Sequence, residues 1–374
     1  MSPERPGPTP RALLVVEQLR RAVPGGIGTF AAGLLMGLDQ LGPDAAAVSL
    51  LASRPPRGAP DPLARFGRPV LTSRLGGRLL TRAWDLSLLS APAGFDVVHA
   101  VSLAFPLPER PSATRLAVSV YDLAWRHHPE TSTPRGRRWH EAAFARALRQ
   151  ADVLVVPSEQ VAEDVRRAGA RPDRVAVVVP GADHLARPDH QAAAARLRRA
   201  GVEGPYLLTV STLEPRKNLT RLVAAYGRAR DRLPGPWPLV VVGPQGWGGG
   251  PLRPSPGVAL LGQVSPAELS GLYAGAALFA YVPLLEGYGL PPVEAMTFGV
   301  PTVVSRGVPS VAEAPAGVSR LVDPLDIGAV AEALVEVAGS EDRRLALAAA
   351  GSTLAAGRRW RTTAEQTVAL WASR

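Results

Sequence analysis

Short apolar runs alternate with helical stretches along the whole 374-residue chain, and this alternation restricts the fold more than any other feature. β-Branched and leucine-rich runs separated by helical stretches are typical of βαβ units, which build parallel sheets. In the first half we expect strands at 12–16, 46–51, 96–99, 116–120, 153–156 and 175–179, with helices that include 30–41 and 139–150. In the second half we expect strands at 207–210, 239–242, 258–261, 278–282 and 302–305, with helices that include 219–233, 266–274 and 327–339.

The pattern restarts near the middle of the chain, which predicts two α/β domains. Pro180-Gly181-Ala182-Asp183 and a polar, alanine-rich stretch lie between the halves, so we place the junction near residue 190. Residues 1–190 and 191–357 then form two doubly wound domains that face each other across a cleft. The tail, 358–374, is long enough for a helix that could pack back on the first domain. Ligands of such sheets bind outside the carboxyl ends of the strands.

Composition is that of an ordinary globular protein, with 46% hydrophobic and 20% charged residues. No apolar run approaches the roughly 20 residues that a membrane-spanning helix needs. The chain has no cysteine, which excludes disulfides and thiolate metal sites and fits a cytoplasmic protein. It also has no Asp-x-Asp motif and no histidine cluster that would hold a metal ion, and we expect no metal and no other cofactor.

The net charge of +10 raises the question of an anionic partner. The arginines are scattered through every segment, and aromatic residues are only 5% of the chain, which is poor for base stacking. We therefore expect no nucleic acid partner. Two enrichments, 54–82 and 135–149, could touch an anionic membrane surface or an anionic acceptor, and a solvated arginine-rich face is the alternative.

Residues 283–305 predict a ligand site, because they read as a strand end, a glycine turn, a short helix, a glycine stop and a second strand. Proline is tolerated in the first helical turn, so Pro291-Pro292 would open the helix. Glycine is favoured just past a helix end, so Gly299 would close it. Glu286 would then lie at the carboxyl end of the strand, and Glu294 in the first turn of the helix.

The backbone between these two glutamates suits an anion. The N–H groups of this turn would point into one crevice, where the helix dipole favours negative charge. Two carboxylates that flank an anion site suit a ligand with hydroxyls at both ends and phosphates between them, and a sugar nucleotide has that form. The turn consists of Gly287, Tyr288, Gly289 and Leu290.

Lys217 is the only lysine among the 42 basic residues. It follows an apolar strand in the segment Ser211-Thr212-Leu213-Glu214-Pro215-Arg216-Lys217-Asn218. An ammonium is a compact point charge and a guanidinium is a planar fork, so the two are not interchangeable at a tight phosphate site. We expect Arg216 and Lys217 to clamp a diphosphate, and a lone exposed loop lysine is the alternative.

Together these segments resemble the retaining glycosyltransferases of the GT-B fold, specifically family four with its many mannosyltransferases. The most specific likeness is the pair Glu286 and Glu294, separated by seven residues. The segment 214–218 resembles the family's phosphate-binding loop, and 180–183 its turn before the linker. The family's glycine-rich acceptor-side loop is matched by Gly25, Gly26, Ile27 and Gly28.

The resemblance implies two Rossmann-like domains and a role for each matching residue. Glu286 would contact the donor sugar hydroxyls and support the reacting centre, and Glu294 would hold the ribose hydroxyls. Arg216 and Lys217 would neutralise the diphosphate and the charge that grows on it as it leaves, a job that a metal ion performs elsewhere. The resemblance also implies retention of anomeric configuration, with a leaving phosphate that helps to deprotonate the acceptor.

The chain departs from the family pattern at several positions. Many relatives carry His-Asp at the end of the fourth strand, where this chain has Tyr121-Asp122. Asp122 could contact the sugar or cap the following turn. His99 could face the cleft or be a buried histidine with satisfied hydrogen bonds. Relatives often carry Gly-Arg where this chain has Ser211 and Thr212, which would still belong to the donor site.

Other functions share parts of this pattern. The segment 26–31 matches the dinucleotide fingerprint G-x-G-x-x-A of an NAD-dependent dehydrogenase, but the expected second strand does not end in a ribose-binding carboxylate. A GT-B epimerase or hydrolase of sugar nucleotides is the second alternative, and a non-catalytic sensor the third. The leading prediction is a hexosyltransferase that uses GDP-mannose, or a UDP-sugar, and an acceptor hydroxyl on a glycan, a glycolipid or a small molecule.

Overall fold

The computed structural model describes residues 9–55, 58, 60–109, 113–246, 252 and 254–373, which form two compact units. Unit 1 comprises Met1–Leu123, Arg135–Gly181 and Arg359–Arg374, and unit 2 comprises Ala124–Pro134 and Ala182–Arg358. The sequence placed the junction near residue 190, whereas the chain passes from unit 1 into unit 2 after Gly181. The difference arises because the polar stretch leads into α6 (His190–Arg199), which packs on α8 (Pro266–Gly275) of unit 2.

Unit 1 contains a seven-stranded, fully parallel sheet in the order β3-β2-β1-β5-β7-β8-β9. Both faces of such a sheet are covered, so its inner strand β1 buries Leu13 and Leu14 completely. A separate pair is formed by the short strands β4 (Ser90–Ala91) and β6 (Leu107–Pro108). The strands of the large sheet are β1 (Arg11–Val15), β2 (Ala47–Ala52), β3 (Val70–Thr72), β5 (Val97–Ala100), β7 (Arg115–Ser119), β8 (Val153–Val156) and β9 (Val175–Val177).

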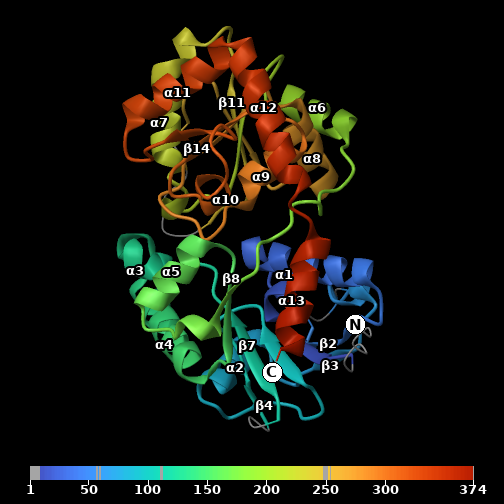
Figure 1. The fold of residues 1–374 in the computed structure, drawn as a ribbon. Coiled ribbons are helices and arrows are strands. Elements are labelled where there is room, and N and C mark those ends of the chain that lie inside the picture. Colours follow the sequence, from blue (N-terminus) through green and yellow to red (C-terminus); the bar gives the residue numbers. More distant parts are fainter. Residues whose placement is uncertain are drawn as a thin grey trace, which may run out of the picture. The chain divides into compact units, whose positions relative to one another are not determined.

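The last helix, α13 (Trp360–Ala372), belongs to unit 1 and packs along α1 (Gly25–Leu41), as Figure 1 shows. Trp360 is fully buried there, and a Cβ atom at Gly33 of α1 would overlap its ring. Close approach of the two helices therefore requires glycine at this position. The other α-helices in the described residues of unit 1 are α2 (Gly77–Asp85), α4 (Pro134–Gln150) and α5 (Glu159–Arg167).

Unit 2 contains a six-stranded parallel sheet in the order β12-β11-β10-β13-β14-β15. Helices α7 (Leu219–Ala229) and α11 (Ile327–Gly339) pack together over one face, where Leu222 and Leu334 join the strand side chains in one core. Helix α12 (Glu341–Ala356) packs on α9 (Leu290–Thr297). The strands are β10 (Leu207–Val210), β11 (Leu239–Val242), β12 (Val258–Gly262), β13 (Leu278–Tyr281), β14 (Thr302–Ser305) and β15 (Arg320–Val322).

The strand order of unit 2 reverses between β10 and β13, which are neighbours in the sheet although β11 and β12 separate them in sequence. In open parallel sheets this reversal leaves a crevice at the carboxyl ends of the two central strands. The loops that follow β10 and β13 therefore carry the residues most suited to meet a ligand. The predicted α/β fold with two doubly wound sheets is confirmed.

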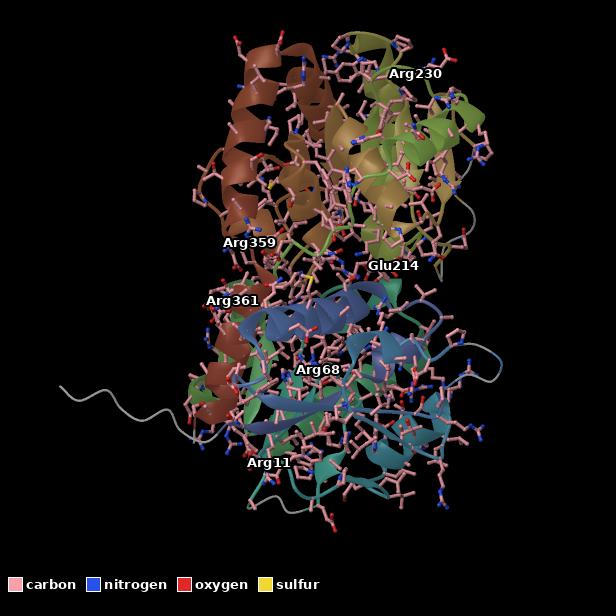
Figure 2. The ribbon with its side chains drawn as sticks, turned by 90° about the vertical axis from the view of Figure 1, so that its right-hand side faces the viewer. Arg11, Arg68, Glu214, Arg230, Arg359 and Arg361 are labelled. Carbon is pink, nitrogen blue, oxygen red and sulfur yellow. The ribbon has the colours of Figure 1, made fainter. Side chains whose placement is uncertain are left out.

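Some surface arginines of both units pair with carboxylates, among them Arg11 and Arg361, which Figure 2 labels. Arg11 contacts Asp96 at 3.2 Å, and Arg361 contacts Glu365 one turn further along α13 at 3.1 Å. Pairs with both side chains this exposed add little to stability, because water and salt screen them.

Candidate active site

The loops after β10 and β13 are joined at the strand-order reversal of unit 2. Asn218 ends the short 3₁₀ turn 215–217 in a left-handed conformation, with φ 58°. Its side-chain amide donates to the carbonyls of Val282 and Pro324, at 2.9 Å each. The backbone N–H of Leu284 donates to the Arg216 carbonyl at 2.9 Å. These bonds hold the predicted cations beside the predicted glutamate.

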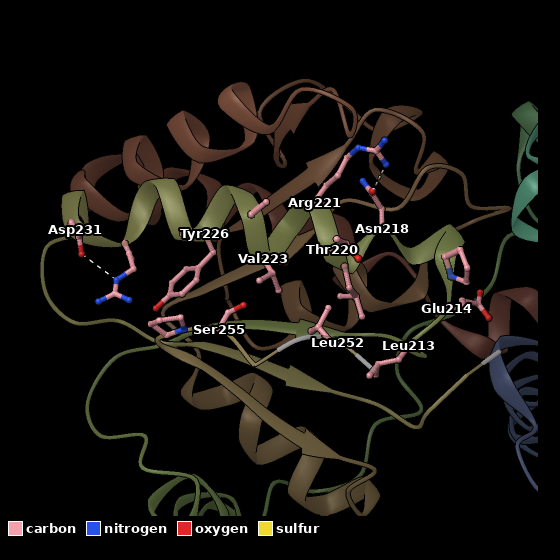
Figure 3. Close-up of a pocket in the computed structure, with 16 residues that line it drawn as sticks. Leu213, Glu214, Asn218, Thr220, Arg221, Val223, Tyr226, Asp231, Leu252 and Ser255 are labelled. Atoms are coloured by element: carbon pink, nitrogen blue, oxygen red, sulfur yellow. Dashed lines mark hydrogen bonds and ion pairs between the residues drawn. The ribbon is translucent and has the colours of Figure 1, made fainter. Parts of the chain in front are cut away.

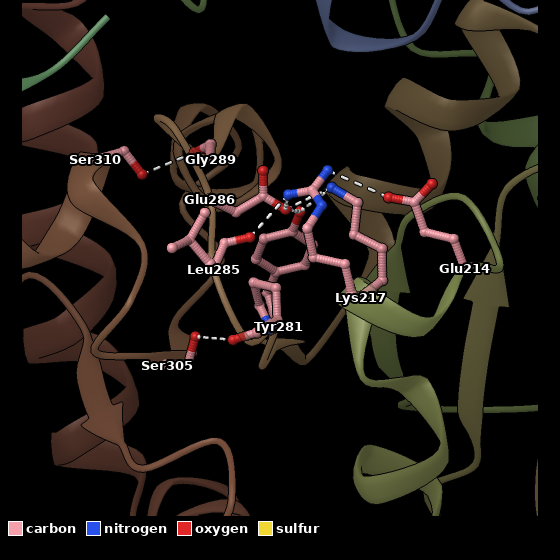
Figure 4. A network of polar contacts seen from close by, with 10 residues as sticks. Glu214, Lys217, Tyr281, Leu285, Glu286, Gly289, Ser305 and Ser310 are labelled. Carbon is pink, nitrogen blue, oxygen red and sulfur yellow. Dashed lines mark hydrogen bonds and ion pairs between the residues drawn. The ribbon is translucent and has the colours of Figure 1, made fainter. Parts of the chain in front are cut away.

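Glu286 is the centre of a polar network (Figure 4). Its Oε1 atom contacts Nζ of Lys217 and lies 3.3 Å from Nη1 of Arg216. The Tyr281 hydroxyl donates to the same oxygen at 2.9 Å and lies 3.1 Å from the Lys217 ammonium. Tyr281 was not among the predicted residues, although its place at the end of β13, five residues before Glu286, was a usable signal.

The charge of Glu286 is fixed by its surroundings. Burial alone would raise its pKa, but Arg216 and Lys217 outweigh burial and lower the pKa to about 2. The carboxylate is thus ionised at neutral pH and can accept hydrogen bonds from hydroxyl groups. The pKa of Tyr281 is raised well above its usual value by burial and by Glu286, so its phenol stays protonated and donates.

Arg216 is held in one orientation by groups on both sides. Its Nη1 atom donates to the Leu285 carbonyl at 2.7 Å, and Nη2 donates to Glu214 at 3.2 Å. Two cations and two carboxylates therefore lie together at this point, with the turn 287–290 directly after Glu286. An anion that enters would meet both cations without needing to order them, because their positions are already set.

Glu294 lies in the second turn of α9 and not, as predicted, in the first. The helix starts at Leu290, after Gly289 in a left-handed conformation with φ 90°. A Cβ atom at Gly289 would overlap the Val308 side chain, so this turn requires glycine. Pro291 lies in the first turn, as expected for a residue without an N–H group.

Both oxygens of the Glu294 carboxylate have partners. Tyr273 donates its hydroxyl to Oε2 at 2.8 Å, and Nε2 of His184 lies 3.2 Å from Oε1. Glu294 is only 8% exposed, so these contacts fix its side chain. Sequence reasoning missed both partners, although His184 directly follows the turn 180–183 that it had singled out.

The remaining predicted donor residues surround the same strand ends. Ser211 is buried directly after β10, and its hydroxyl has no hydrogen-bond partner in the described part of the chain. Thr212 is partly buried. In the turn 287–290, Tyr288 is buried, and burial raises its pKa to about 12 in spite of Arg358 nearby.

The glycines predicted as an acceptor-side loop form the first turn of α1, and their acceptor-side role stays a prediction. The helix begins at Gly25, which has φ 60°, and includes Gly26, Ile27 and Gly28. Sequence reasoning started this helix at residue 30, because glycine disfavours helix interiors. Gly25 and Gly26 are exposed, whereas Gly28 is buried.

His99 is buried with both ring nitrogens bonded, so it lines no open site. The Trp371 indole N–H lies 3.2 Å from Nδ1, and the Ser119 hydroxyl lies 3.0 Å from Nε2. An indole only donates, so Nδ1 accepts and Nε2 carries the proton. Burial lowers the pKa of His99 to about 4, which keeps the ring neutral. The acceptor-side hypothesis for His99 is wrong, and its structural alternative holds.

Tyr121 and Asp122 follow β7, where relatives were expected to carry His-Asp. The Tyr121 ring packs edge-to-face on Phe30, with ring centroids 5.4 Å apart, and burial raises the pKa of its hydroxyl. Asp122 is half-buried next to it in sequence. Within the described residues there is no group of three His, Asp or Glu side chains placed to hold a metal ion.

A groove of about 970 Å³ runs along α7 in unit 2 (Figure 3). Its lining is mostly apolar, with Leu219, Val223 and Leu252, and it extends to Glu214. Neither Lys217 nor Glu286 lines it, so it lies beside the polar network and is not the predicted site. None of the described helices is both long and apolar enough to cross a membrane.

Two doubly wound parallel sheets in one chain, with cations and a glutamate at the strand-order reversal of one, are the arrangement of the GT-B fold. Residues 24–184 match Glycosyltransferase Family 4, and residues 196–353 match Glycosyl transferases group 1. The chain belongs to the group 1 glycosyltransferases, as the sequence predicted.

Known proteins resemble the chain over most of its length. It is 27% identical over 274 residues to the O-antigen chain mannosyltransferase B of Escherichia coli, covering 71% of each chain. It is 30% identical over 289 residues to the D-inositol 3-phosphate glycosyltransferase of Corynebacterium urealyticum, covering 68% of this chain and 67% of the relative. The crystal structure of Anabaena HepE with UDP and glucose is similar in fold, with a TM-score of 0.72, 17% identity, and coverage of 98% and 100%.

Proposed function

We propose that this protein transfers a hexosyl group from a nucleoside-diphosphate sugar to an acceptor hydroxyl, with retention of anomeric configuration. The observation that carries the proposal is the convergence of Arg216 and Lys217 on Glu286, directly before the turn that opens α9. In this proposal unit 2 holds the donor: the cations and the turn take the diphosphate, and Glu294 takes the ribose.

The chemistry follows from the charges of these groups. As the bond between the sugar and the diphosphate breaks, negative charge grows on the leaving phosphate. Arg216 and Lys217 are held in place to stabilise that charge, which is the contribution that lowers the barrier most in such reactions. Glu286, ionised with a pKa of about 2, would accept hydrogen bonds from the sugar hydroxyls. The departing phosphate would help to take the acceptor proton on the same face, which preserves the configuration.

The two side-chain cations supply the charge that a metal ion supplies in other phosphate chemistry, so we propose a metal-independent reaction. Activity should then be unchanged by a chelator. For the donor we propose GDP-mannose, because the relative from Escherichia coli is a mannosyltransferase, with a UDP-sugar as the second choice. The named relatives differ in their acceptors, so we propose only an acceptor hydroxyl here.

A thermal-shift panel of GDP, UDP, GDP-mannose and UDP-glucose tests the donor site. A ligand at about 100 times its Kd adds about 2.7 kcal/mol of stability, which is a readily measured rise in Tm. The Lys217→Ala variant should lose most of the shift. Absence of any shift in the wild type, or an equal shift in the variant, would contradict the proposed diphosphate clamp.

A GT-B epimerase or hydrolase would bind the same donor, so binding alone does not separate it from a transferase. Donor turnover with and without candidate acceptors does: a transferase produces a glycosylated acceptor, and its turnover rises with acceptor concentration. Release of free sugar or an epimer at a rate independent of acceptor would instead favour the alternative.

A further inference from the structure

The described part of the chain exposes eight large apolar side chains, and four of them lie within residues 79–89 of unit 1. Scattered exposed leucines are ordinary, but a concentration on one short segment marks an interaction surface. The four are Leu79 at 65%, Leu86 at 50%, Leu88 at 70% and Leu89 at 41% exposure.

Helix α2 presents charge and apolar surface on one side. At about 100° per residue, Arg78, Arg82, Leu86 and Leu79 fall within an arc of about 100°. The opposite side carries the buried Leu80, Ala83 and Trp84. Arg78 and Arg82 are exposed, as is Arg74 before the helix. Such an outer face can pair its arginines with anionic headgroups while its leucines enter the apolar layer beneath, the two contacts that hold helices at a membrane interface.

The segment is firmly attached to unit 1. The Trp84 carbonyl accepts a 2.7 Å hydrogen bond from the buried Arg146, and the backbone N–H of Leu88 donates to the Ala83 carbonyl at 2.9 Å. Strand β4 then begins at Ser90 and pairs with β6. The leucines are therefore displayed by an ordered support and are not the side chains of an unfolded loop.

The second arginine enrichment lies next to the first. Trp139 of α4 donates its indole N–H to Asp85, the last residue of α2, at 2.9 Å. Helix α4 begins with the exposed Arg135, Arg137 and Arg138, so its first turn adds positive charge beside the end of α2. The sequence had separated these two enrichments by some 50 residues, and the fold brings them together.

We infer that α2, the loop 86–89 and the first turn of α4 form a surface that docks on an anionic lipid bilayer. A polysaccharide would satisfy the arginines but would bury no leucine. A second copy of the same face would oppose like charges in a chain of net charge +10. A bilayer offers anionic headgroups and an apolar layer beneath them, and each basic residue near such a surface contributes about 1 kcal/mol.

Co-sedimentation of the full chain with vesicles tests the inference, using phosphatidylglycerol mixed with phosphatidylcholine and, separately, phosphatidylcholine alone. We expect binding to the anionic vesicles only, weakened when salt is raised from about 0.1 M to about 1 M, where screening is nearly complete. The double variant Arg78→Gln, Arg82→Gln should weaken vesicle binding about 25-fold, because each arginine near the surface contributes about 1 kcal/mol of binding free energy. Leu86→Ser with Leu88→Ser should weaken it by about tenfold or more.

Matched controls come from unit 2. Leu325→Ser with Leu345→Ser changes two leucines that are 59% and 62% exposed, and Arg198→Gln with Arg199→Gln removes the same charge from α6. Both should bind as the wild type does. The inference is overturned by any of three results: the wild type does not bind anionic vesicles, the control variants lose as much vesicle binding as the α2 variants do, or the leucine variants bind as the wild type does. Leucine-dependent dimerisation without vesicle binding would assign the surface to a second copy instead.

Discussion

The substitution Glu286→Gln tests whether the polar network at the head of α9 is held by charge. It keeps the size of the side chain and removes its negative charge, so Arg216 and Lys217 lose their shared partner. We expect the protein to be less stable at neutral pH, because two partly buried cations lose their shared carboxylate partner.

The magnitude follows from the pKa of Glu286, which is about 2 against an ordinary 4.5. At about 1.4 kcal/mol per pKa unit this corresponds to roughly 3 kcal/mol at pH 7. The folded-state pKa is the lower one, so this stability is complete above 4.5 and is lost as the pH falls toward 2. At about pH 3, less than half of it should remain.

Urea unfolding of wild type and variant, followed by circular dichroism at pH 7 and pH 3, measures the difference at each pH. We expect a gap of roughly 3 kcal/mol that narrows by more than half on acidification. Glu332→Gln, which breaks an exposed pair with Arg232, is the control and should show little change at either pH. Equal losses at both pH values, or no loss at pH 7, would refute the electrostatic account.

Three further predictions concern the same unit. Lys217→Arg preserves the charge but replaces a compact ammonium by a planar guanidinium, and it should lower kcat about 10²-fold in steady-state assays. Unchanged kinetics would show that the site does not require an ammonium. His184→Ala should raise the donor KM more than it lowers kcat, because Glu294 loses the contact that orients it, and His184→Gln should restore most of the affinity. Gly289→Ala should lower the free energy of unfolding by about 1–3 kcal/mol, measured against Gly227→Ala, whose Cβ would meet open space.

Much of the fold could be read from the sequence because parallel strands are buried on both faces. Strands β8, β10, β11 and β14 and helix α11 have the bounds that apolar runs predicted. The strands missed in the two large sheets lie at edges, and β3 and β15 have only three residues each, too few to show a pattern. The two-residue strands β4 and β6 were missed as well. The prediction placed the start of helix α1 five residues too late, at residue 30, because the low helix propensity of glycine argued against a helix at Gly25, Gly26 and Gly28.

The candidate site, too, was predicted only in part. Glu286, Arg216 and Lys217 belong to two local motifs, each directly after a strand, so parallel topology alone brings them together. Tyr273 and His184 reach Glu294 from a helix and a linker that no local pattern connects to it. His99 was misplaced because its partner, Trp371, lies 272 residues away in sequence. Contacts of that range depend on the whole fold.

The packing of α13 on α1 has a consequence for biosynthesis. Unit 1 receives Trp360 and Trp371 for its core from the final helix, after nearly all of unit 2 has been translated. While the ribosome makes unit 2, the nascent first unit has an open slot over Gly33 and a His99 ring without its indole donor. Unit 1 can therefore complete its core only after α13 has been translated, and until then the slot over Gly33 leaves apolar surface exposed.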